Sequence, residues 1–564
     1  MNSLTVALIS FAALSLGYFL YGRFLKRYWE IDESRPTPGQ KYHDGVDYVC
    51  AKNWFVLFGH HFASIAGAGP ILGPVIAAIA WGWFPVAIWI VLGSILLGGV
   101  HDFSALMASV KYQGRSIAEV SEKVGTPRLR LLFTWFIFLT LILVVAVFAA
   151  VAANTLVSMP ELVIPTFALV GIAILVGFFV YRWHWNLAIA TVIGIVLVVI
   201  SLLAGFHWPI AINLPVPGQQ IIWILILMVY AYVASVIPVN ILLQPRDYIS
   251  SFILFFGLIT GIIGLFLTHP QMHTPAFISW HSHSGPLWPM LMVTVACGAI
   301  SGFHSLVASG TTSKQLPNEK DALKIGYGGM ITEGALAILA LVSVCAGLAW
   351  TRGQGIPVYS ELMKDGDWIV TFAEGFGQLT KPLFGAAGTA VAAVMLNSFV
   401  LTTLDTATRI NRYILEEISL SWRFIQRPHQ KKQKETNEPE NWSGGATTIN
   451  PYTSTTIVVG LSILLAIGNW SLIWPVFGAA NQQVAALALI TVSLVLLNMG
   501  KSAWITIYPA ILMLATTIGA LIYQGIGFFK ANNWLLGIIS LVLLFLAIFV
   551  CIEAISVVKR WKTA

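Results

Sequence analysis

Charged residues are scarce in this chain: Asp, Glu, Lys and Arg together make up 10% of its 564 residues. Soluble domains carry about 25% charged residues, so the composition is not that of a soluble globular protein. Cysteine is also scarce, and the spacing of the four cysteines predicts neither a disulfide framework nor a metal site. The sequence lacks a Walker loop, an HExxH motif and a nucleophile elbow, so it predicts no enzyme activity and no cofactor.

Apolar runs long enough to cross a bilayer fill most of the chain. Hydrophobic residues make up 57% of the sequence. Windows of about 20 apolar residues divide it into about fifteen spans, which predicts an all-α polytopic membrane protein. The expected spans cover residues 3–24, 55–80, 84–110, 131–154, 162–181, 186–205, 220–244, 250–268, 287–310, 326–350, 384–410, 454–470, 474–497, 503–524 and 533–557.

One expected span, 55–80, contains strong helix breakers in its middle. Three glycines and two prolines fall between Gly67 and Pro74. Proline removes a backbone donor and glycine weakens a helix, so the freed backbone groups need other partners. Either the helix is kinked and packs through small residues, or it is discontinuous and its break forms a substrate site near the middle of the membrane. The second interpretation predicts a site made of Gly67, Ala68, Gly69 and Pro70.

The span expected at 220–244 is also interrupted, at residues 234–240, by a proline with polar neighbours. It lies five spans after the first interrupted span, so the two run in opposite directions across the membrane. Paired interruptions of this kind are typical of transporters built from inverted repeats. We therefore predict a leucine-transporter-like five-plus-five inverted repeat, with its core in the ten spans from 55 to 410. In this scheme Ser235 and Asn240 add hydrogen bonds to the substrate.

Few ionisable residues fall inside the expected spans. They are candidates for function, because a charge in hydrocarbon is costly. Histidine titrates near physiological pH, and a buried carboxyl group beside it can be brought toward the same range, which favours a proton relay. The expected relay consists of His61, His101, Asp102, His304 and Asp405. A structural role stays open for Asp405, which stands one helical turn before Arg409 and could pair with it.

Basic residues gather in alternate loops, whereas the loops at 206–219 and 269–286 contain no Lys or Arg. By the positive-inside rule this places the N-terminus outside and the C-terminus in the cytoplasm. The net charge of +7 lies largely in these loops and does not indicate a nucleic-acid partner. The 269–286 loop carries four histidines whose spacing is not that of a standard zinc site, so no metal site is predicted.

The longest polar stretch, 411–453, is expected to be a flexible cytoplasmic linker. It divides the chain into a long N-terminal unit and a C-terminal group of about four spans. The predicted division is 1–50 for an N-terminal accessory helix and loop, 51–410 for the transporter core, 411–453 for the linker and 454–564 for C-terminal accessory helices.

Long and specific segments occur in a fixed order at residues 53–74, 101–103, 114–117, 301–304, 318–334 and 402–409. The first reads NWFVLFGHHFASIAGAGPILGP. Together they resemble the carbon starvation protein A family. The resemblance implies a bacterial inner-membrane transporter of the amino-acid–polyamine–cation superfamily, linked to nutrient limitation. It also implies uptake of pyruvate with protons or uptake of peptides, the two activities assigned to members of the family.

The leading hypothesis is a proton-coupled symporter that takes up a small carboxylate such as pyruvate. The carboxylate would accept hydrogen bonds from N–H groups freed at the first break, where the positive end of a half-helix suits an anion. One alternative is a proton-coupled peptide transporter, in which Asp102, Glu333 and Asp405 would receive the amine. Another is a nutrient sensor that binds its ligand without transport. Sodium coupling, through hydroxyls such as those of Ser64 and Thr294, and the oligomeric state stay open.

Overall fold

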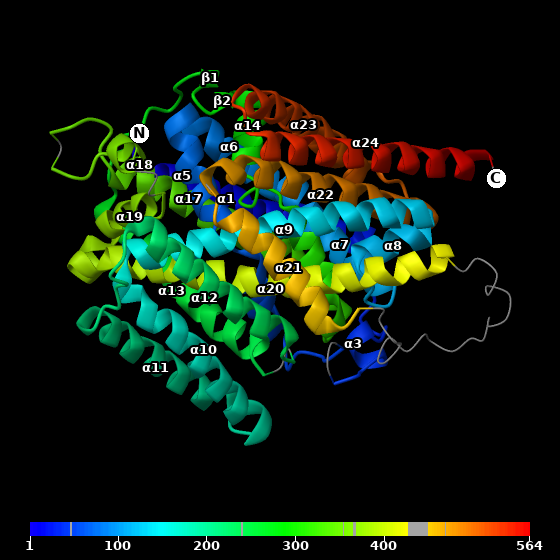
Figure 1. The fold of residues 1–564 in the computed structure, drawn as a ribbon, viewed down its shortest axis with the longest axis horizontal. Coiled ribbons are helices and arrows are strands. Elements are labelled where there is room, and N and C mark those ends of the chain that lie inside the picture. The colour runs from blue at the N-terminus through cyan, green and yellow to red at the C-terminus, as the bar shows by residue number, and fades with distance from the viewer. Residues whose placement is uncertain are drawn as a thin grey trace.

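The computed structural model describes residues 1–45, 48–238, 241–353, 355–364, 368–426, 449–468 and 470–563. Nearly all of this part of the chain is helical (Figure 1). Within it, 12 helices are long and apolar enough to cross a membrane, or up to 13 if the bent pair α4–α5 is counted as one span. The chain is therefore a multi-pass membrane protein, and its two termini lie at opposite ends of the helical body (Figure 1).

The first half of the chain contains α1 (Ser3–Gly17), α2 (Arg23–Tyr28), α3 (Pro38–Lys41), α4 (Trp54–Ile65), α5 (Gly69–Trp81), α6 (Trp83–Gly93), α7 (Gly99–Lys111), α8 (Ile117–Val124), α9 (Pro127–Ser158), α10 (Val163–Gly177), α11 (Leu187–His207), α12 (Val216–Val236) and α13 (Leu243–Thr268). The second half contains a two-stranded hairpin of β1 (His281–Ser282) and β2 (Gly285–Pro286), followed by α14 (Leu287–Thr294), α15 (Gly302–Val307), α16 (Ser313–Gln315), α17 (Gly328–Gly347), α18 (Tyr359–Lys364), α19 (Trp368–Phe384), α20 (Gly388–Gln426), α21 (Pro451–Ala466), α22 (Trp470–Asn498), α23 (Trp504–Lys530) and α24 (Trp534–Thr563). Short π-helical turns continue several helices, for example Ala308–Thr312 between α15 and α16.

Every expected span coincides with a helix or a pair of helices, and α19 is an addition. This helix was not predicted because Glu374, Lys381 and Pro382 interrupt its apolar sequence. It packs against the C-terminal ends of α13 and α17: a Cβ atom on Gly264 would lie 2.6 Å from the Leu379 carbonyl oxygen.

Two sets of helices repeat the same packing pattern. The first set is α4–α5, α6–α7, α9, α12 and α13, and the second is α14–α16, α17, α20, α21 and α22. Helices α9 and α20 pack on each other, and both α12 and α21 pack on this pair. Helix α13 packs on α4 and α20, and its counterpart α22 packs on α15 and α9. This is the predicted five-plus-five inverted repeat, with the α10–α11 hairpin inserted into the first half.

The position of the second repeat differs from the prediction in one respect. Helix α12 ends at Val236 and α13 begins at Leu243, so the interruption expected inside the 220–244 span is a connection between two helices. The second repeat begins at α14 and reaches α22, beyond the boundary expected at residue 410. The inserted α10–α11 hairpin caused the error, because it shifts the count of spans between corresponding helices from five to seven.

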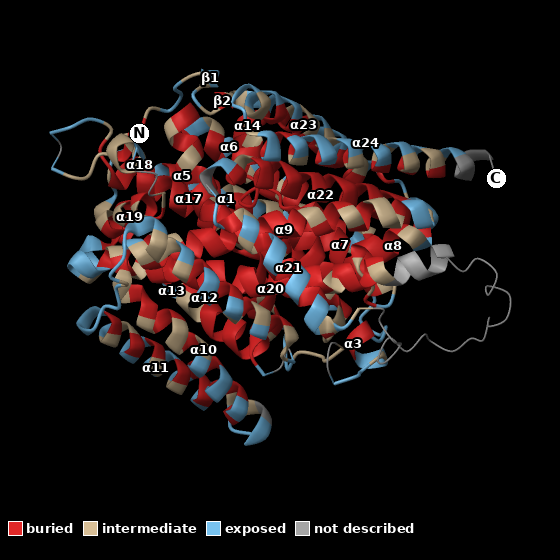
Figure 2. Cartoon of the chain, in the orientation of Figure 1, coloured by how far each residue is buried: buried red, intermediate tan, exposed pale blue. Residues whose placement is uncertain are grey.

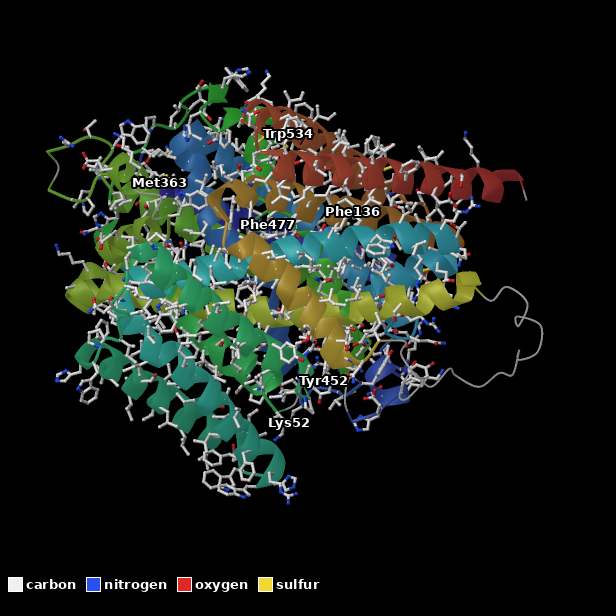
Figure 3. All side chains as sticks on the ribbon, in the orientation of Figure 1. Lys52, Phe136, Met363, Tyr452, Phe477 and Trp534 are labelled. Carbon is white, nitrogen blue, oxygen red and sulfur yellow. The ribbon has the colours of Figure 1, made fainter. Side chains whose placement is uncertain are left out.

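The centre of the molecule is formed by α9 and α22, which are almost wholly buried, whereas α11 and α24 expose most of their length (Figure 2). Phe136 of α9 and Phe477 of α22 lie inside the helical body (Figure 3). The ring of Phe477 packs edge-on against Phe148 of α9 at a centroid distance of 5.8 Å. Helix α22 therefore belongs to the core of the fold, although it follows the stretch expected to be a flexible linker. That expectation was wrong for residues 411–426, which continue α20.

Candidate functional site

The first helix break lies between α4 and α5, as predicted. Helix α4 ends at Ile65, α5 begins at Gly69, and the two are bent by 43°. The N–H groups of Ala66 and Gly67 still donate to carbonyl oxygens of α4. Those of Ala68 and Gly69 have no acceptor among the residues that the structure describes. The break therefore presents two free N–H groups at the start of α5, a helix end that suits an anion.

Helix α20 supplies hydrogen-bond donors to the other side of the break. The hydroxyl groups of Thr402 and Thr403 donate to the carbonyl oxygens of Ala63 and Ser64 at 2.7 and 3.4 Å. A Cβ atom on Gly67 would lie 2.8 Å from the hydroxyl oxygen of Thr403. A glycine is needed there because α20 approaches the backbone so closely.

The second break lies between α14 and α15, where residues 295–301 are not helical. It packs directly on the first break. A Cβ atom on Gly69 would lie 2.4 Å from the sulfur of Cys297, and one on Gly73 would lie 2.8 Å from the carbonyl oxygen of Thr294. Numbering rises along α5 while it falls along α14, so the two interrupted helices are antiparallel. Contact between two breaks is the arrangement expected of a substrate site at a repeat interface.

Ser235, predicted to bind substrate, lies instead at the end of α12. Its side chain is buried, and its hydroxyl group has no hydrogen-bond partner among the described residues. The carbonyl oxygens on either side of it, at Ala234 and Ile237, accept hydrogen bonds from Arg409. Ser235 therefore belongs to the α12–α20 contact and not to a helix break. Asn240, the other residue predicted there, lies outside the described residues.

Four of the five residues predicted to form a proton relay lie in one buried group. We call it the histidine–carboxylate cluster, and it consists of His101 and Asp102 on α7, His304 on α15, Glu333 on α17 and His61 on α4, whose ring lies against α17 at Gly329, one turn before Glu333. The carboxylate of Asp102 contacts Nδ1 of His101 at 2.7 Å and Nδ1 of His304 at 2.8 Å. Nε2 of His304 lies 3.2 Å from Oε2 of Glu333. The group thus joins α7, α15 and α17 through titratable side chains.

The histidine–carboxylate cluster contains unsatisfied polar atoms. His61 contacts the hydroxyl group of Thr312 through Nδ1 at 2.8 Å, but its Nε2 has no hydrogen-bond partner among the described residues. The same is true of Nε2 of His101 and of both carboxylate oxygens of Glu333. Buried polar atoms without partners are rare in native structures, and a role in function is one explanation for them.

Asp405, the fifth predicted relay residue, lies in a different buried group. We call this the arginine–aspartate cluster, and it consists of His60 on α4, Tyr230 on α12, Arg246 and Asp247 on α13 and Asp405 on α20. Nη2 of Arg246 donates to Asp247 at 2.6 Å and to Asp405 at 2.9 Å, and Nη1 makes a second bond to Asp405. The hydroxyl group of Tyr230 also donates to Asp405, at 2.8 Å. Asp405 therefore pairs with Arg246 and not with Arg409.

His60 is held by hydrogen bonds at both ring nitrogens. Nδ1 contacts the carboxylate of Asp247 at 2.8 Å, and Nε2 lies 3.2 Å from the amide nitrogen of Gln315. The side-chain oxygen of Gln315 accepts a hydrogen bond from Gln244 at 2.8 Å, which fixes the orientation of its amide. This pattern is that of a neutral histidine protonated on Nδ1.

Several residues of these sites were not singled out from the sequence, among them Arg246, Asp247 and Asn481. Arg246 was assigned to a cytoplasmic loop because it lies at the edge of an apolar run, yet it is 1% exposed in α13. Its neighbour Asp247 forms a buried ion pair with it, which the position of both residues at the edge of an apolar run does not reveal. Asn481 lies in an Asn-Gln-Gln run in the middle of an apolar span, and it contacts the second break.

Metal ligation has no support in the side-chain geometry. In the described ranges, no group of three or more His, Cys, Asp or Glu residues is arranged to hold a metal ion. The four histidines of the 269–286 loop are included in that search.

The sequence pattern of the family described as "Carbon starvation protein CstA" matches residues 2–350 and 359–520. The chain belongs to this family. Its CstA-family relatives include the peptide transporter CstA of Campylobacter jejuni, which is 32% identical over 89% of this chain and 77% of its own length. The pyruvate/proton symporter BtsT of Escherichia coli is 31% identical over 94% of this chain and 82% of its own length. The CstA match continues through α21 and α22 into α23, so these helices after the linker are part of the family pattern.

The fold resembles that of solved transporters. A crystal structure of the manganese transporter of Eremococcus coleocola superposes with a TM-score of 0.56 at 12% identity, over 92% of this chain and 99% of the other. At this identity the likeness concerns the fold alone. The family match and the named relatives make this chain a membrane transporter, and the likeness to the solved structure agrees with its leucine-transporter-like fold.

Proposed function

We propose that this protein is a proton-coupled symporter for a small carboxylate such as pyruvate in the bacterial plasma membrane, and that it is not an enzyme. The observation that carries the proposal is the position of the histidine–carboxylate cluster. His61 lies on the first interrupted helix and His304 on the second, so the cluster touches both halves of the repeat. A proton bound there can change how the two interrupted helices are held. The name of the relative BtsT, a pyruvate/proton symporter, supports the same pairing of substrate and ion.

The substrate site is placed at the first break. The free N–H groups of Ala68 and Gly69 and the positive end of the α5 dipole suit a carboxylate. Gly67 and Pro70 flank these donors: glycine permits the close approach of α20, and proline at the start of α5 leaves one N–H fewer to satisfy. A carboxylate bound here would also contact the second break, because Gly69 packs against Cys297.

Proton binding is assigned to Asp102, His304 and Glu333. With Asp102 accepting hydrogen bonds through both oxygens, His304 carries its proton on Nδ1 and turns Nε2 toward Glu333 at 3.2 Å. A single proton shared by Nε2 and the Glu333 carboxyl removes one negative charge from the buried group. An anionic substrate then enters without adding to the net negative charge inside the membrane, which is the physical reason for symport.

A proton-coupled peptide transporter is the second candidate. It is favoured by the two oxygens of Glu333, which have no hydrogen-bond partner among the described residues and would suit a peptide amine. Relatives named peptide transporters, such as that of Campylobacter jejuni, support it as well. Asp405 is no longer a candidate for the amine, because Arg246 occupies both of its oxygens.

The proposed orientation keeps the N-terminus outside and the C-terminus in the cytoplasm. The distribution of basic residues supports it, as does the position of the termini at opposite ends of the body (Figure 1). Accessibility of single cysteines added at Asn2 and at Lys559 to a membrane-impermeant maleimide tests the orientation. Labelling in intact cells is expected for the first and not for the second.

Uptake of radiolabelled pyruvate into proteoliposomes tests the substrate and the ion together. An inward proton gradient is expected to drive accumulation with or without sodium, and a protonophore is expected to abolish it. Di- and tripeptides in excess should not compete. Competition by peptides at low concentration would favour the second candidate, and accumulation that requires sodium would contradict proton coupling.

A further inference from the structure

Helix α22 carries three consecutive amide side chains, Asn481, Gln482 and Gln483, and all three are buried. Consecutive residues on a helix point in directions about 100° apart, so each amide meets a different partner. Gln482 donates to the carbonyl oxygen of Met292 on α14 at 2.7 Å, and Gln483 accepts a hydrogen bond from Thr517 on α23. Only Asn481 of the three reaches the non-helical residues of the second break.

Asn481 makes three contacts at that break. Its side-chain oxygen accepts a hydrogen bond from the backbone N–H of Phe303 at 2.9 Å. Its side-chain nitrogen donates to the hydroxyl group of Ser301 at 2.9 Å and lies 3.5 Å from the sulfur of Cys297. Ser301 precedes α15 but its own side chain makes no capping hydrogen bond. Asn481 therefore caps α15 from another helix, and it does so next to the cysteine that packs on Gly69.

The backbone of α22 also follows the interrupted helix closely on both sides of the break. A Cβ atom on Gly478 would lie 2.3 Å from the carbonyl oxygen of Val293 in α14. A Cβ atom on Gly302 in α15 would lie 2.2 Å from the carbonyl oxygen of Asn481. Helix α22 thus spans the break and holds the two half-helices together.

The first repeat contains the same arrangement. Helix α13, the counterpart of α22, presents Asp247 to α4, where it contacts His60 at 2.8 Å and accepts a hydrogen bond from Ser64 at 3.3 Å. Asp247 therefore holds the half-helix before the first break as Asn481 holds the half-helix after the second. The contact of Asp247 with α4 is made by a carboxylate, whereas the contact of Asn481 with α15 is made by a neutral amide.

We propose that Asn481 is a positioning residue of the transport site: it fixes the second break so that Cys297 stays packed on Gly69 and the first break keeps the geometry that binds substrate. The predicted effect of Asn481 on pyruvate transport rests on the proposed function. Its predicted effect on the packing of the second break does not. The side chain of Asn481 contacts Phe303, Ser301 and Cys297 and none of the residues assigned to proton binding. Removing this side chain should therefore weaken substrate binding and leave the dependence of uptake on the proton gradient unchanged.

The test compares Asn481→Ala with Gln483→Ala. Both remove a buried amide from the same helix, but Gln483 faces α23 and serves as the matched control. In proteoliposomes Asn481→Ala is expected to raise the KM for pyruvate about tenfold, which corresponds to about 1.4 kcal/mol, and to leave the maximal rate within about twofold. Gln483→Ala is expected to leave both constants within about twofold of wild type. Asn481→Ser, which keeps a short hydrogen-bonding side chain, replaces the alanine variant if that variant does not reach the membrane.

A second readout needs no transport. In a chain whose Cys50, Cys345 and Cys551 are replaced by serine, a membrane-permeant maleimide reports the accessibility of Cys297. Asn481→Ala is expected to speed labelling several-fold, and Gln483→Ala is not. Equal labelling of the two variants, or equal changes in KM, would overturn the proposal. Faster labelling of the Asn481 variant in a protein that does not transport pyruvate would leave the positioning role standing and reject the substrate.

Discussion

The histidine–carboxylate cluster and the arginine–aspartate cluster both begin on α4, at the consecutive residues His61 and His60, but they differ in how well their atoms are satisfied. In the arginine–aspartate cluster, Arg246 bridges two carboxylates, and His60 has a partner at each ring nitrogen. In the histidine–carboxylate cluster, both oxygens of Glu333 and a ring nitrogen of His61 have no hydrogen-bond partner among the described residues. In the arginine–aspartate cluster, Nε of Arg246 alone lacks a hydrogen-bond partner among the described residues, so this cluster is the more nearly closed of the two by its own contacts.

This difference in hydrogen bonding distinguishes a structural role from a role in proton coupling, although both clusters consist of charged side chains inside the membrane. A buried ion pair with most hydrogen bonds made resists change, because removing one partner strands a charge in a medium of low dielectric. It joins α12, α13 and α20 to α4, the half-helix before the first break. We therefore assign the arginine–aspartate cluster to the support of the break and the histidine–carboxylate cluster to proton coupling.

The largest effect is expected for Arg246→Ala. The substitution leaves Asp247 and Asp405 buried without their cation and should destabilise the fold by about 3–5 kcal/mol. The yield of folded protein in the membrane and its melting temperature in detergent measure this. Arg352→Ala removes an exposed arginine that pairs with Glu361 and should leave both unchanged. A melting temperature near that of wild type for Arg246→Ala would contradict the supporting role.

The consecutive histidines of α4 allow a sharper comparison. His61→Gln should retain near-normal yield and lose most proton-driven uptake, because His61 is the member of the histidine–carboxylate cluster that lies on the first interrupted helix. His60→Gln removes a ring that both Asp247 and Gln315 contact, so it should lower the melting temperature more than it lowers uptake per folded molecule. Uptake and melting temperature are measured on the same preparations. The reverse pattern would exchange the roles of the two clusters.

The smallest effect is expected for Gly69→Ala, which adds one methyl group beside Cys297. Because Gly69 and Cys297 pack so closely, we expect Gly69→Ala to lose part of the uptake while the yield of protein stays unchanged. A second substitution, Cys297→Gly, in the same chain should restore part of the lost uptake. Gly171→Ala on α10 is the control, since a Cβ atom there meets nothing within 4 Å. Normal uptake by Gly69→Ala would remove the first break from the substrate site.

The sequence predicted the first break because its signal is local: Gly67, Pro70 and Pro74 lie together in an apolar run. The second break has no such signal. Residues 295–301 contain a single glycine and no proline, and their non-helical backbone is held by Asn481, which lies about 180 residues later in the chain. A break made by tertiary contacts is not visible in hydropathy or in helix propensity.

The same limit applied to the charges. His101 and Asp102 are neighbours in sequence, and their contact followed from it. The structural role left open for Asp405 had Arg409, one turn away, as its partner, whereas the fold brings Arg246 to it from a separation of 159 residues. Spacing in the sequence indicates only nearby partners, whereas the packing of α13 on α20 determines that Asp405 pairs with Arg246.

The assignment of proton coupling to the histidine–carboxylate cluster is tested most directly by measuring pyruvate accumulation and pyruvate exchange for Glu333→Gln and for Glu319→Gln. Glu319 is also buried, but it pairs with Arg35 outside the histidine–carboxylate cluster. Glu333→Gln is expected to lose at least tenfold of the pyruvate accumulation driven by a proton gradient, while pyruvate exchange across vesicles without a gradient continues, because the substrate site stays intact and only the proton site is lost. Glu319→Gln should keep both activities. Proton-driven accumulation by Glu333→Gln at the wild-type rate would contradict the assignment of coupling to the histidine–carboxylate cluster.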